Sequence, residues 1–344
     1  MEQDNRDKVY DSKQSPLVSF VIPMYNEAEH IQPCLDSILV QDYPKECIEI
    51  HVIDGVSSDD SASIVENYIS TSIAQIFLHN NPKRKTPISL NIGIQAAQGD
   101  VIIILGAHTE IDSNFVRLNV NNLNQNRVWC SGGTQINVGK TVLQSSIGVA
   151  MSHWFGMPSA AYRYRKKAGY VNTVVYGAYK KEVFNEVGLF EEIGFMSEDA
   201  ELNLRIIKGG YKIYYDPKIK SRYYPRKTLI TFFKQMYNYG ILRSQIFKKH
   251  GSGLLWLHFL PPLVIVFIPL MAIFSLIVQP IKLVVLVIVL LYVIIAAFSA
   301  LNAFLIQKKG NPFLVSIAFL SMHIAWALGF LAGTLKRNSK SNRK

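Results

Sequence analysis

The chain has 344 residues, with 36 Lys and Arg against 25 Asp and Glu, and its formal net charge is +11. Residues 1–216 hold 19 basic and 25 acidic side chains, a net charge of −6, whereas residues 217–344 hold 17 basic side chains and no acidic one. An acidic N-terminal part of this size would repel a polyanion, so the charge argues against nucleic-acid binding and favours an anionic membrane surface.

The first 15 residues are polar and mixed in charge, and they contain no apolar run of the kind that directs secretion. Three cysteines, Cys34, Cys47 and Cys130, are an odd number and lack metal-ligand spacing. Buried, reduced thiols in a cytoplasmic domain are the expectation for such a set.

Apolar runs and helical patterns alternate from residue 16 to about residue 215. Strands are predicted over 17–24, 48–53, 75–78 and 101–105, and helices over 28–40, 61–69 and 87–98. This order predicts a Rossmann-like α/β domain with a mostly parallel sheet. Such sheets bind ligands beyond the carboxyl ends of their strands, and polar clusters follow several of these strands.

The C-terminal third is apolar. Residues 228–250 are predicted to form an amphipathic interfacial segment. Three stretches without charged side chains follow, 254–278, 283–306 and 313–335, each longer than the roughly 20 residues that a membrane-spanning helix needs. The predicted domains are therefore a polar tail (1–15), an α/β domain (16–227), the interfacial segment (228–250), a membrane domain with two or three transmembrane helices (251–335) and a basic tail (336–344).

The number of crossings stays open at this stage. Pro261, Pro262 and Pro269 interrupt the first stretch, which could kink or lie in the interface. With three crossings, Lys308 and Lys309 lie on the cytoplasmic side and the basic tail lies outside; with two crossings, in which the first stretch does not span, these positions are exchanged.

Four polar clusters stand at predicted strand ends: PMYNE (23–27), DGVSSD (54–59), GAHTE (106–110) and SED (197–199). Together with VSFVIPMYNEAEHI and IEIHVIDGVSSDDS, they make residues 17–245 similar to the inverting family 2 glycosyltransferases of GT-A fold. The GAHTE version and the apolar end resemble the membrane-bound subgroup that builds exopolysaccharides such as succinoglycan. The resemblance implies a multi-pass plasma-membrane enzyme with a cytoplasmic catalytic domain, a UDP-linked sugar donor and a lipid-linked saccharide acceptor.

Asp54 follows an apolar strand and precedes a Gly-containing turn, so its carboxylate should enter the crevice; the alternative is a helix cap. The resemblance implies that Asp54 contacts uracil.

Tyr25 is expected to stack on the base and Glu27 to bond the ribose, or both simply belong to a turn. Arg84 or Lys83 is a candidate for the diphosphate, against a solvated loop. The donor is further expected beside Pro23, Gly106 and Ala107.

Family members usually carry Asp-x-Asp where this chain has Gly106, Ala107 and His108. His108 is therefore the candidate ligand of a divalent cofactor, Mn²⁺ or Mg²⁺, with phosphate oxygens and water as the other ligands. Glu110 could replace the lost carboxylate, or the site could be inactive.

Asp199 is the residue that the resemblance implies as general base, with Glu198 as a supporting contact; the alternative is a capped helix start. Gln235 and Arg243 partly match the Gln-x-x-Arg-Trp element of processive synthases and are candidates for the acceptor or diphosphate. Trp is absent from that element.

Two alternative functions stay open. One is a processive synthase, whose pore would need a homo-oligomer, and the other is a catalytically inactive membrane scaffold.

Overall fold

A computed structural model describes residues 15–192 and 198–335. They form two compact units. The first comprises residues 15–135, 165–192 and 198–223, and the second comprises residues 136–164 and 224–335. The second unit thus contains residues 136–164 in addition to the C-terminal helices.

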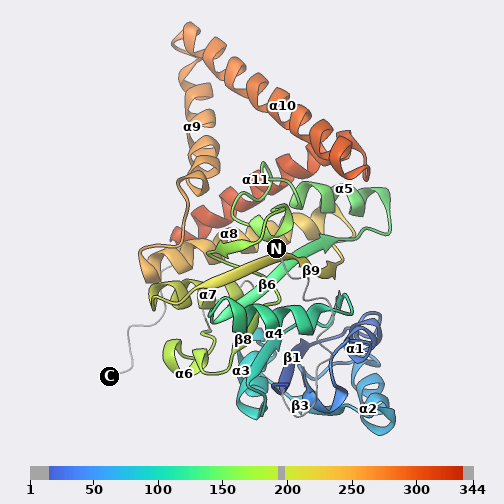
Figure 1. Ribbon diagram of the computed structural model, residues 1–344. Helices are drawn as coiled ribbons and strands as arrows, with labels where there is room; N and C mark the ends of the chain where they lie inside the picture. The colour runs from blue at the N-terminus through green and yellow to red at the C-terminus, as the bar shows by residue number, and fades with distance from the viewer. Residues whose placement is uncertain (1–14, 193–197, 336–344) are drawn as a thin grey trace, which may run out of the picture. The chain divides into compact units, whose positions relative to one another are not determined.

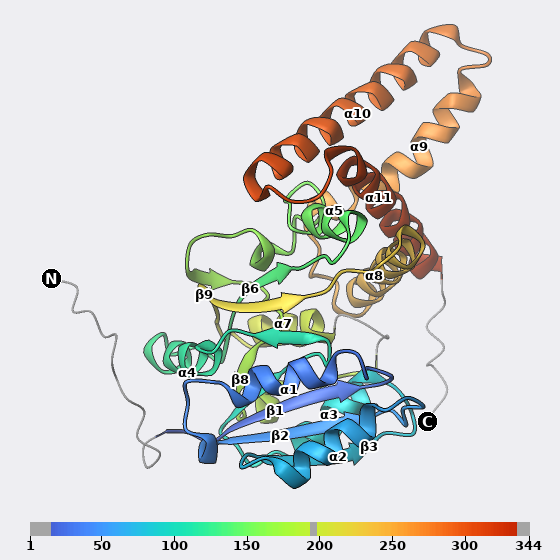
Figure 2. The same cartoon turned by 90° about the vertical axis from the view of Figure 1, so that its right-hand side faces the viewer.

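One mixed sheet organises the first unit (Figures 1 and 2). Its strand order is β3-β2-β1-β4-β8-β6-β9-β5, with β7 on β9. The first four strands in that order are parallel, which confirms the prediction, and β8, β5 and β7 add antiparallel pairs. The strands are β1 (Val18–Met24), β2 (Ile48–Asp54), β3 (Gln75–Asn80), β4 (Val101–Ile104), β5 (Thr109–Ile111), β6 (Cys130–Asn137), β7 (Gly169–Val171), β8 (Ala178–Lys180) and β9 (Ile213–Tyr223).

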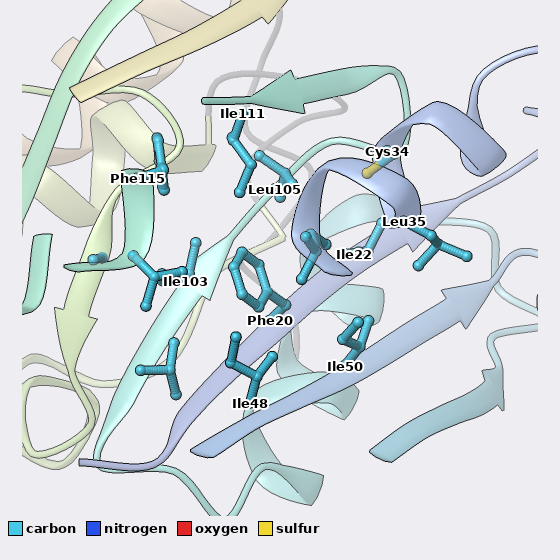
Figure 3. Close-up of a cluster of buried hydrophobic side chains, with 14 of the residues drawn as sticks. Phe20, Ile22, Cys34, Leu35, Ile48, Ile50, Ile103, Leu105, Ile111 and Phe115 are labelled. Carbon is cyan, nitrogen blue, oxygen red and sulfur yellow. The ribbon is translucent and has the colours of Figure 1, made fainter. Parts of the chain in front are cut away.

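Helices follow the parallel strands as the alternation predicts. The core on one face of the sheet is formed by alternate residues of adjacent strands, among them Phe20 and Ile22 of β1 and Ile50 of β2, packed with Leu35 (Figure 3). All four side chains are fully buried, and each such burial contributes on the order of 1.5–3 kcal/mol. The helices of this unit are α1 (Ile31–Leu39), α2 (Ser61–Thr71), α3 (Thr86–Ala96), α4 (Phe115–Gln125), α6 (Val183–Val187) and α7 (Glu198–Lys208), with a 3-10 turn, η1 (Lys45–Cys47).

Helix α1 begins three residues later than the predicted start at Ala28. The backbone N–H of Glu27 donates to Ser61 Oγ at 2.7 Å, and that of Ala28 donates to Asp59 Oδ2 at 3.1 Å. These long-range bonds hold the chain in a turn, so regular helix begins only at Ile31.

The second unit consists of helices. They are α5 (Val142–Met151), α8 (Leu229–His250), α9 (Leu260–Phe274), α10 (Gln279–Gln307) and α11 (Pro312–Leu335), with 3-10 turns η2 (Ala161–Arg163) and η3 (Trp256–His258). Thr228 caps α8 by accepting from the N–H of Thr231. Helix α9 continues through Pro269.

Among the described residues, three helical segments are long and apolar enough to cross a membrane: Trp256–Phe274, Gln279–Gln307 and Pro312–Leu335. They correspond to the three apolar stretches of the sequence.

Candidate active site

The turns after β1, β2 and β3 each contain a non-glycine residue with a left-handed backbone. Asn26, Val56 and Arg84 have φ of 53°, 60° and 53°. This conformation is unusual for a β-branched residue such as Val56, and strained backbone gathers at functional sites. The carboxyl ends of these parallel strands are also where an α/β sheet binds its ligands.

Tyr25 and Arg84 meet at this edge. The guanidinium carbon of Arg84 lies 5.1 Å from the centre of the Tyr25 ring, and Arg84 Nη1 donates to Tyr25 Oη at 3.3 Å. Arg84 Nη2 also donates to the carbonyl of Val56 at 3.3 Å. The sequence suggests Arg84 for the diphosphate, whereas here its guanidinium lies at the ring that is predicted to stack on the base. Tyr25 remains 46% exposed, which leaves part of the ring free for a ligand.

Asp54 ends β2 and is 4% exposed. Its carboxylate accepts from the backbone N–H of Ser57 at 3.0 Å and from Ser57 Oγ at 2.5 Å. Asp54 thus shapes the turn that follows it. Asp59 accepts from the N–H and the hydroxyl of Ser61, the first residue of α2.

Glu27 and His108 face each other from the turns after β1 and β4, with 3.0 Å between Glu27 Oε1 and His108 Nδ1. Their side chains are 22% and 36% exposed. The His108 ring also packs edge-on against Tyr223, with 5.6 Å between centroids. The sequence suggests Glu27 for the ribose and His108 for the metal, and the structure brings these two side chains into contact.

Gly106 and Ala107 connect β4 to His108. The Gly106 carbonyl accepts from the N–H of Thr109 at 3.0 Å and from Cys34 Sγ at 3.7 Å. Burial is the main cause that raises the pKa of the Cys34 thiol to about 12, and the negative charges of Glu27 and Glu110 raise it further. Ala107 is buried.

Glu110 lines a cleft of about 840 Å³ beside α1, together with Asp36, Asp112 and Arg222. Arg222 pairs with Asp112 at 2.7 Å. Glu110 therefore faces this cleft, although its charge also acts on Cys34.

Pro23 is the sixth residue of β1 and pairs in register with Ile53 of β2. The pairing of β1 with β4 ends at Val21, so the missing N–H of Pro23 leaves no ladder bond unmade with β4.

Asp199 is the second residue of α7, and its Oδ1 accepts from the N–H of Ala200 at 2.8 Å. Its charge contributes to raising the pKa of two buried groups, Tyr179 and Cys130, for which burial is the main cause. Tyr179 Oη donates to Asn203 Oδ1 at 3.3 Å, which fixes the phenol against the middle of α7. The side chain of Glu198 lies outside the described residues.

Gln235 and Arg243 both lie on α8, in the second unit. Gln235 is buried, and its Nε2 donates to Tyr239 Oη at 3.3 Å. Arg243 is half-buried.

Comparison with known proteins identifies a domain within the N-terminal part of the chain. Residues 19–188 match the family model described as Glycosyl transferase family 2. Residues 19–188 are a family 2 glycosyltransferase domain. A dolichyl N-acetyl-alpha-D-glucosaminyl phosphate 3-beta-D-2,3-diacetamido-2,3-dideoxy-beta-D-glucuronosyltransferase of Methanococcus voltae is 28% identical and covers 94% of this chain and 98% of its own. The succinoglycan biosynthesis protein ExoA of Rhizobium meliloti is 26% identical over 90% of this chain and 92% of its own.

A solved structure with a similar fold is the mannosyltransferase PcManGT from Pyrobaculum calidifontis, in complex with GDP-Man and Mn²⁺. It has 18% sequence identity and a TM-score of 0.63, and it covers 93% of this chain and 87% of its own. The glycosyltransferase therefore has the GT-A fold, as the sequence predicts, and it is an enzyme rather than a scaffold.

GT-A glycosyltransferases commonly use a divalent metal. No group of three His, Cys, Asp or Glu suited to a metal occurs in residues 15–192 and 198–335. Glu27 and His108 nevertheless provide one carboxylate and one imidazole, 3.0 Å apart and partly exposed. This donor set fits an ion that takes its remaining ligands from phosphate oxygens and water. When bound, the ion would neutralise charge on the leaving diphosphate.

Two site neighbours were not predicted from the sequence. Tyr223 reaches His108 because β5 pairs with β9, which puts Thr109 opposite Tyr223. Tyr179 approaches Asp199 through the fold of β8 and α7. A single sequence carries no signal for either contact, because both join segments that are distant along the chain.

Proposed function

We propose that the glycosyltransferase transfers a sugar, with inversion, from a UDP-linked donor to a lipid-linked saccharide at a membrane, with its catalytic domain on the cytoplasmic side. The observation that carries the proposal is the grouping of Tyr25, Asp54 and Arg84 with Glu27 and His108 at the carboxyl ends of adjacent strands.

In the donor site, Tyr25 offers an aromatic face for the uracil, and Asp54 offers carboxylate oxygens for its ring nitrogen. The guanidinium of Arg84 lies over the Tyr25 ring, and its five N–H donors suit the oxygens of a nucleotide. Pro23, Gly106 and Ala107 form the backbone walls between these side chains. Glu27 and His108 would hold Mn²⁺ or Mg²⁺, which would offset the negative charge of the diphosphate.

In the transfer step, the Asp199 carboxylate removes the proton of the acceptor hydroxyl while its oxygen attacks the anomeric carbon and the nucleoside diphosphate leaves. Glu198 supports the acceptor, and Gln235 and Arg243 contact the acceptor or its diphosphate.

The lipid-linked acceptor is supported by the glucuronosyltransferase of Methanococcus voltae, whose name specifies a dolichyl phosphate-linked acceptor and which is similar along nearly the whole chain. Membrane anchoring is supported by the three apolar segments that follow the glycosyltransferase domain.

The test combines calorimetric titration of UDP with an assay of sugar transfer to a polyprenyl phosphate-linked saccharide in purified membranes. UDP should bind more tightly with Mn²⁺ than without it. Asp199→Asn should retain UDP binding and lose transfer by about 100-fold or more. Asp60→Asn is the matched control and should retain transfer, because Asp60 is exposed and its side chain makes no capping hydrogen bond to α2. Failure of UDP to bind under both conditions, or unchanged transfer by Asp199→Asn, would overturn the assignment.

A further inference from the structure

Helix α11 differs from the other two apolar segments in its burial. In the most apolar 18-residue window of α11, 44% of the residues are buried by protein, against 11% in the α9 segment and 17% in α10. A helix that crosses lipid beside few neighbours would expose most of its surface, as α9 and α10 do. The protein elements that cover α11 therefore indicate where it lies.

Helix α8 covers one side of α11, and the two run in the same direction (Figures 1 and 2). A Cβ atom added at Gly240 of α8 would overlap the carbonyl oxygen of Trp326, and one added at Gly329 would overlap the carbonyl oxygen of Tyr237. At the end of the pair, Lys248 Nζ donates to the carbonyl of Gly333 at 3.1 Å and also to that of Thr334. The backbones are thus in close contact up to the C-terminus of α11.

Helix α5 and the turn after it cover the other part of α11. The N–H of Asn311, just before α11, donates to Ser146 Oγ of α5 at 2.9 Å. In the middle of α11, His323 Nε2 lies 2.9 Å from the carbonyl oxygen of Phe155. The start, middle and end of α11 are therefore each held by α5, its following turn or α8.

Neither α5 nor α8 can cross a bilayer. Helix α5 has 10 residues and is about 15 Å long, half the thickness of the hydrocarbon core. Helix α8 has 22 residues but carries Lys234, Arg243, Lys248 and Lys249. Since no described helix between α5 and α8 is long and apolar enough to cross, α5 and α8 lie on the same side of the membrane.

Building on the membrane anchoring proposed above, we infer that α9 and α10 form a hairpin that crosses the bilayer and returns, whereas α11 lies beside α8 on the bilayer surface. Only the parts of α9 and α10 beyond their contacts with α11 can cross. Helix α9 follows the contact of Phe259 with Phe330 and reaches about 22 Å. In α10, the Tyr292 hydroxyl lies 2.9 Å from His323 Nδ1, and residues 279–291 reach about 20 Å beyond that contact. Because a surface helix sinks roughly 5–10 Å into the boundary of headgroups and acyl chains, these lengths approach the roughly 30 Å of the hydrocarbon core. Figure 2 shows this hairpin leading away from α11.

The charges agree with two crossings in this arrangement. Residues 275–278, which connect α9 to α10 at the far end of the hairpin, carry no charge, and Lys282 in the first turn of α10 adds a single basic residue there. Lys308 and Lys309, the basic residues of α8 and the five Lys and Arg of 336–344 then all share one side, as the positive-inside rule requires. This resolves the conflict that the sequence leaves open, because the non-crossing segment is the third and not the first. The bound partner of the α8 and α11 surface is an anionic lipid surface.

The test uses single cysteines and a membrane-impermeant maleimide in sealed vesicles of known orientation. The reporters are Gln279→Cys at the hairpin tip, Lys309→Cys in the α10–α11 connection, Lys249→Cys at the end of α8, and a cysteine appended after Lys344. The native cysteines are buried and give little background. We expect the last three reporters to react from one face and Gln279→Cys to react only from the opposite face.

Two outcomes overturn the arrangement. Reaction of the appended cysteine from the same face as Gln279→Cys would mean that α11 crosses. Reaction of all four reporters from one face would mean that the hairpin does not cross. Sugar transfer measured on the same vesicles tests the proposed function separately, because loss of transfer does not alter which face each cysteine occupies. If the Lys309→Cys protein accumulates poorly, Lys308→Cys takes its place as the reporter in the α10–α11 connection.

Discussion

The imidazole of His108 and the carboxylate of Glu27 face each other across the ends of two adjacent strands, with 3.0 Å between Nδ1 and Oε1. The two residues are 81 positions apart in the sequence. Glu27 belongs to the PMYNE cluster (23–27), and its carboxylate contacts His108. His108 ends the segment Gly106-Ala107-His108, which stands where the resembled family usually has Asp-x-Asp. Glu27 can therefore supply charge that Gly106 does not.

The first prediction concerns this pair. His108→Ala should abolish metal-stimulated transfer, because it removes the imidazole ligand. Glu27→Gln should weaken the apparent affinity for Mn²⁺ by about 10- to 100-fold, because it removes the carboxylate charge beside His108. Titration of transfer rate against Mn²⁺ measures both effects. Glu66→Gln, an exposed change on α2, is the control, and an unchanged Mn²⁺ dependence in Glu27→Gln would contradict the pairing.

The second prediction concerns the Tyr25 ring. Tyr25→Ala should weaken UDP binding by about 1–3 kcal/mol, which is the usual contribution of stacking a base on an aromatic side chain. Thermal stability should change little, since Tyr25 is 46% exposed. Calorimetry provides the affinity. Tyr170→Ala removes a ring that is 55% exposed on β7 and serves as the control; equal affinities for the two variants would remove Tyr25 from the donor site.

The third prediction concerns the contact between α8 and α11. Gly329→Val places a branched side chain where the backbone of Tyr237 lies, so the helices must separate. We expect a destabilisation of about 1–3 kcal/mol, visible as a lower melting temperature of the purified protein in detergent. Leu328→Val, at the neighbouring exposed position, should melt near the wild-type temperature. Equal melting temperatures for both variants would mean that the close approach does not stabilise the protein.

The fourth prediction concerns the buried thiols. Burial raises the pKa of Cys34 from 9.0 to about 12, so at pH 8 its thiolate should be roughly 1000-fold rarer than that of an ordinary cysteine. Disulfide reagents that attack the thiolate should therefore react with Cys34 very slowly in the folded protein and rapidly in denaturant. Mass spectrometry of the labelled peptides identifies the reacting residue. Rapid labelling of Cys34 at pH 8 without denaturant would contradict its burial under Gly106.

The same raised pKa has a consequence for stability. The pKa of the Cys34 thiol is 9.0 in the unfolded chain and about 12 in the folded protein. The contribution of the protonated thiol to folding stability is therefore fully present below pH 9 and is lost as the pH rises towards 12. Cys34→Ala should reduce this alkaline loss of stability. Melting temperatures between pH 8 and pH 11 for both proteins measure the difference.

Local sequence patterns determined much of the architecture. The alternation of apolar strands and helices fixes four parallel strands, because strand and helix periods are properties of a few neighbouring residues. The three long apolar segments are likewise visible without a structure. The motifs around Asp54 and His108 follow from their positions at strand ends.

Tertiary structure alone decided how these parts are used. The contact of Glu27 with His108 and that of Arg84 with Tyr25 depend on which turns the parallel sheet brings together. Apolar length predicts the same role for α10 and α11, yet only α11 packs closely on α8, because Gly240 and Gly329 let two backbones touch. Hydropathy shows that a segment is apolar enough to be buried, but it does not distinguish burial in lipid from burial against protein. The shape of the surface that the helix meets determines which of the two occurs.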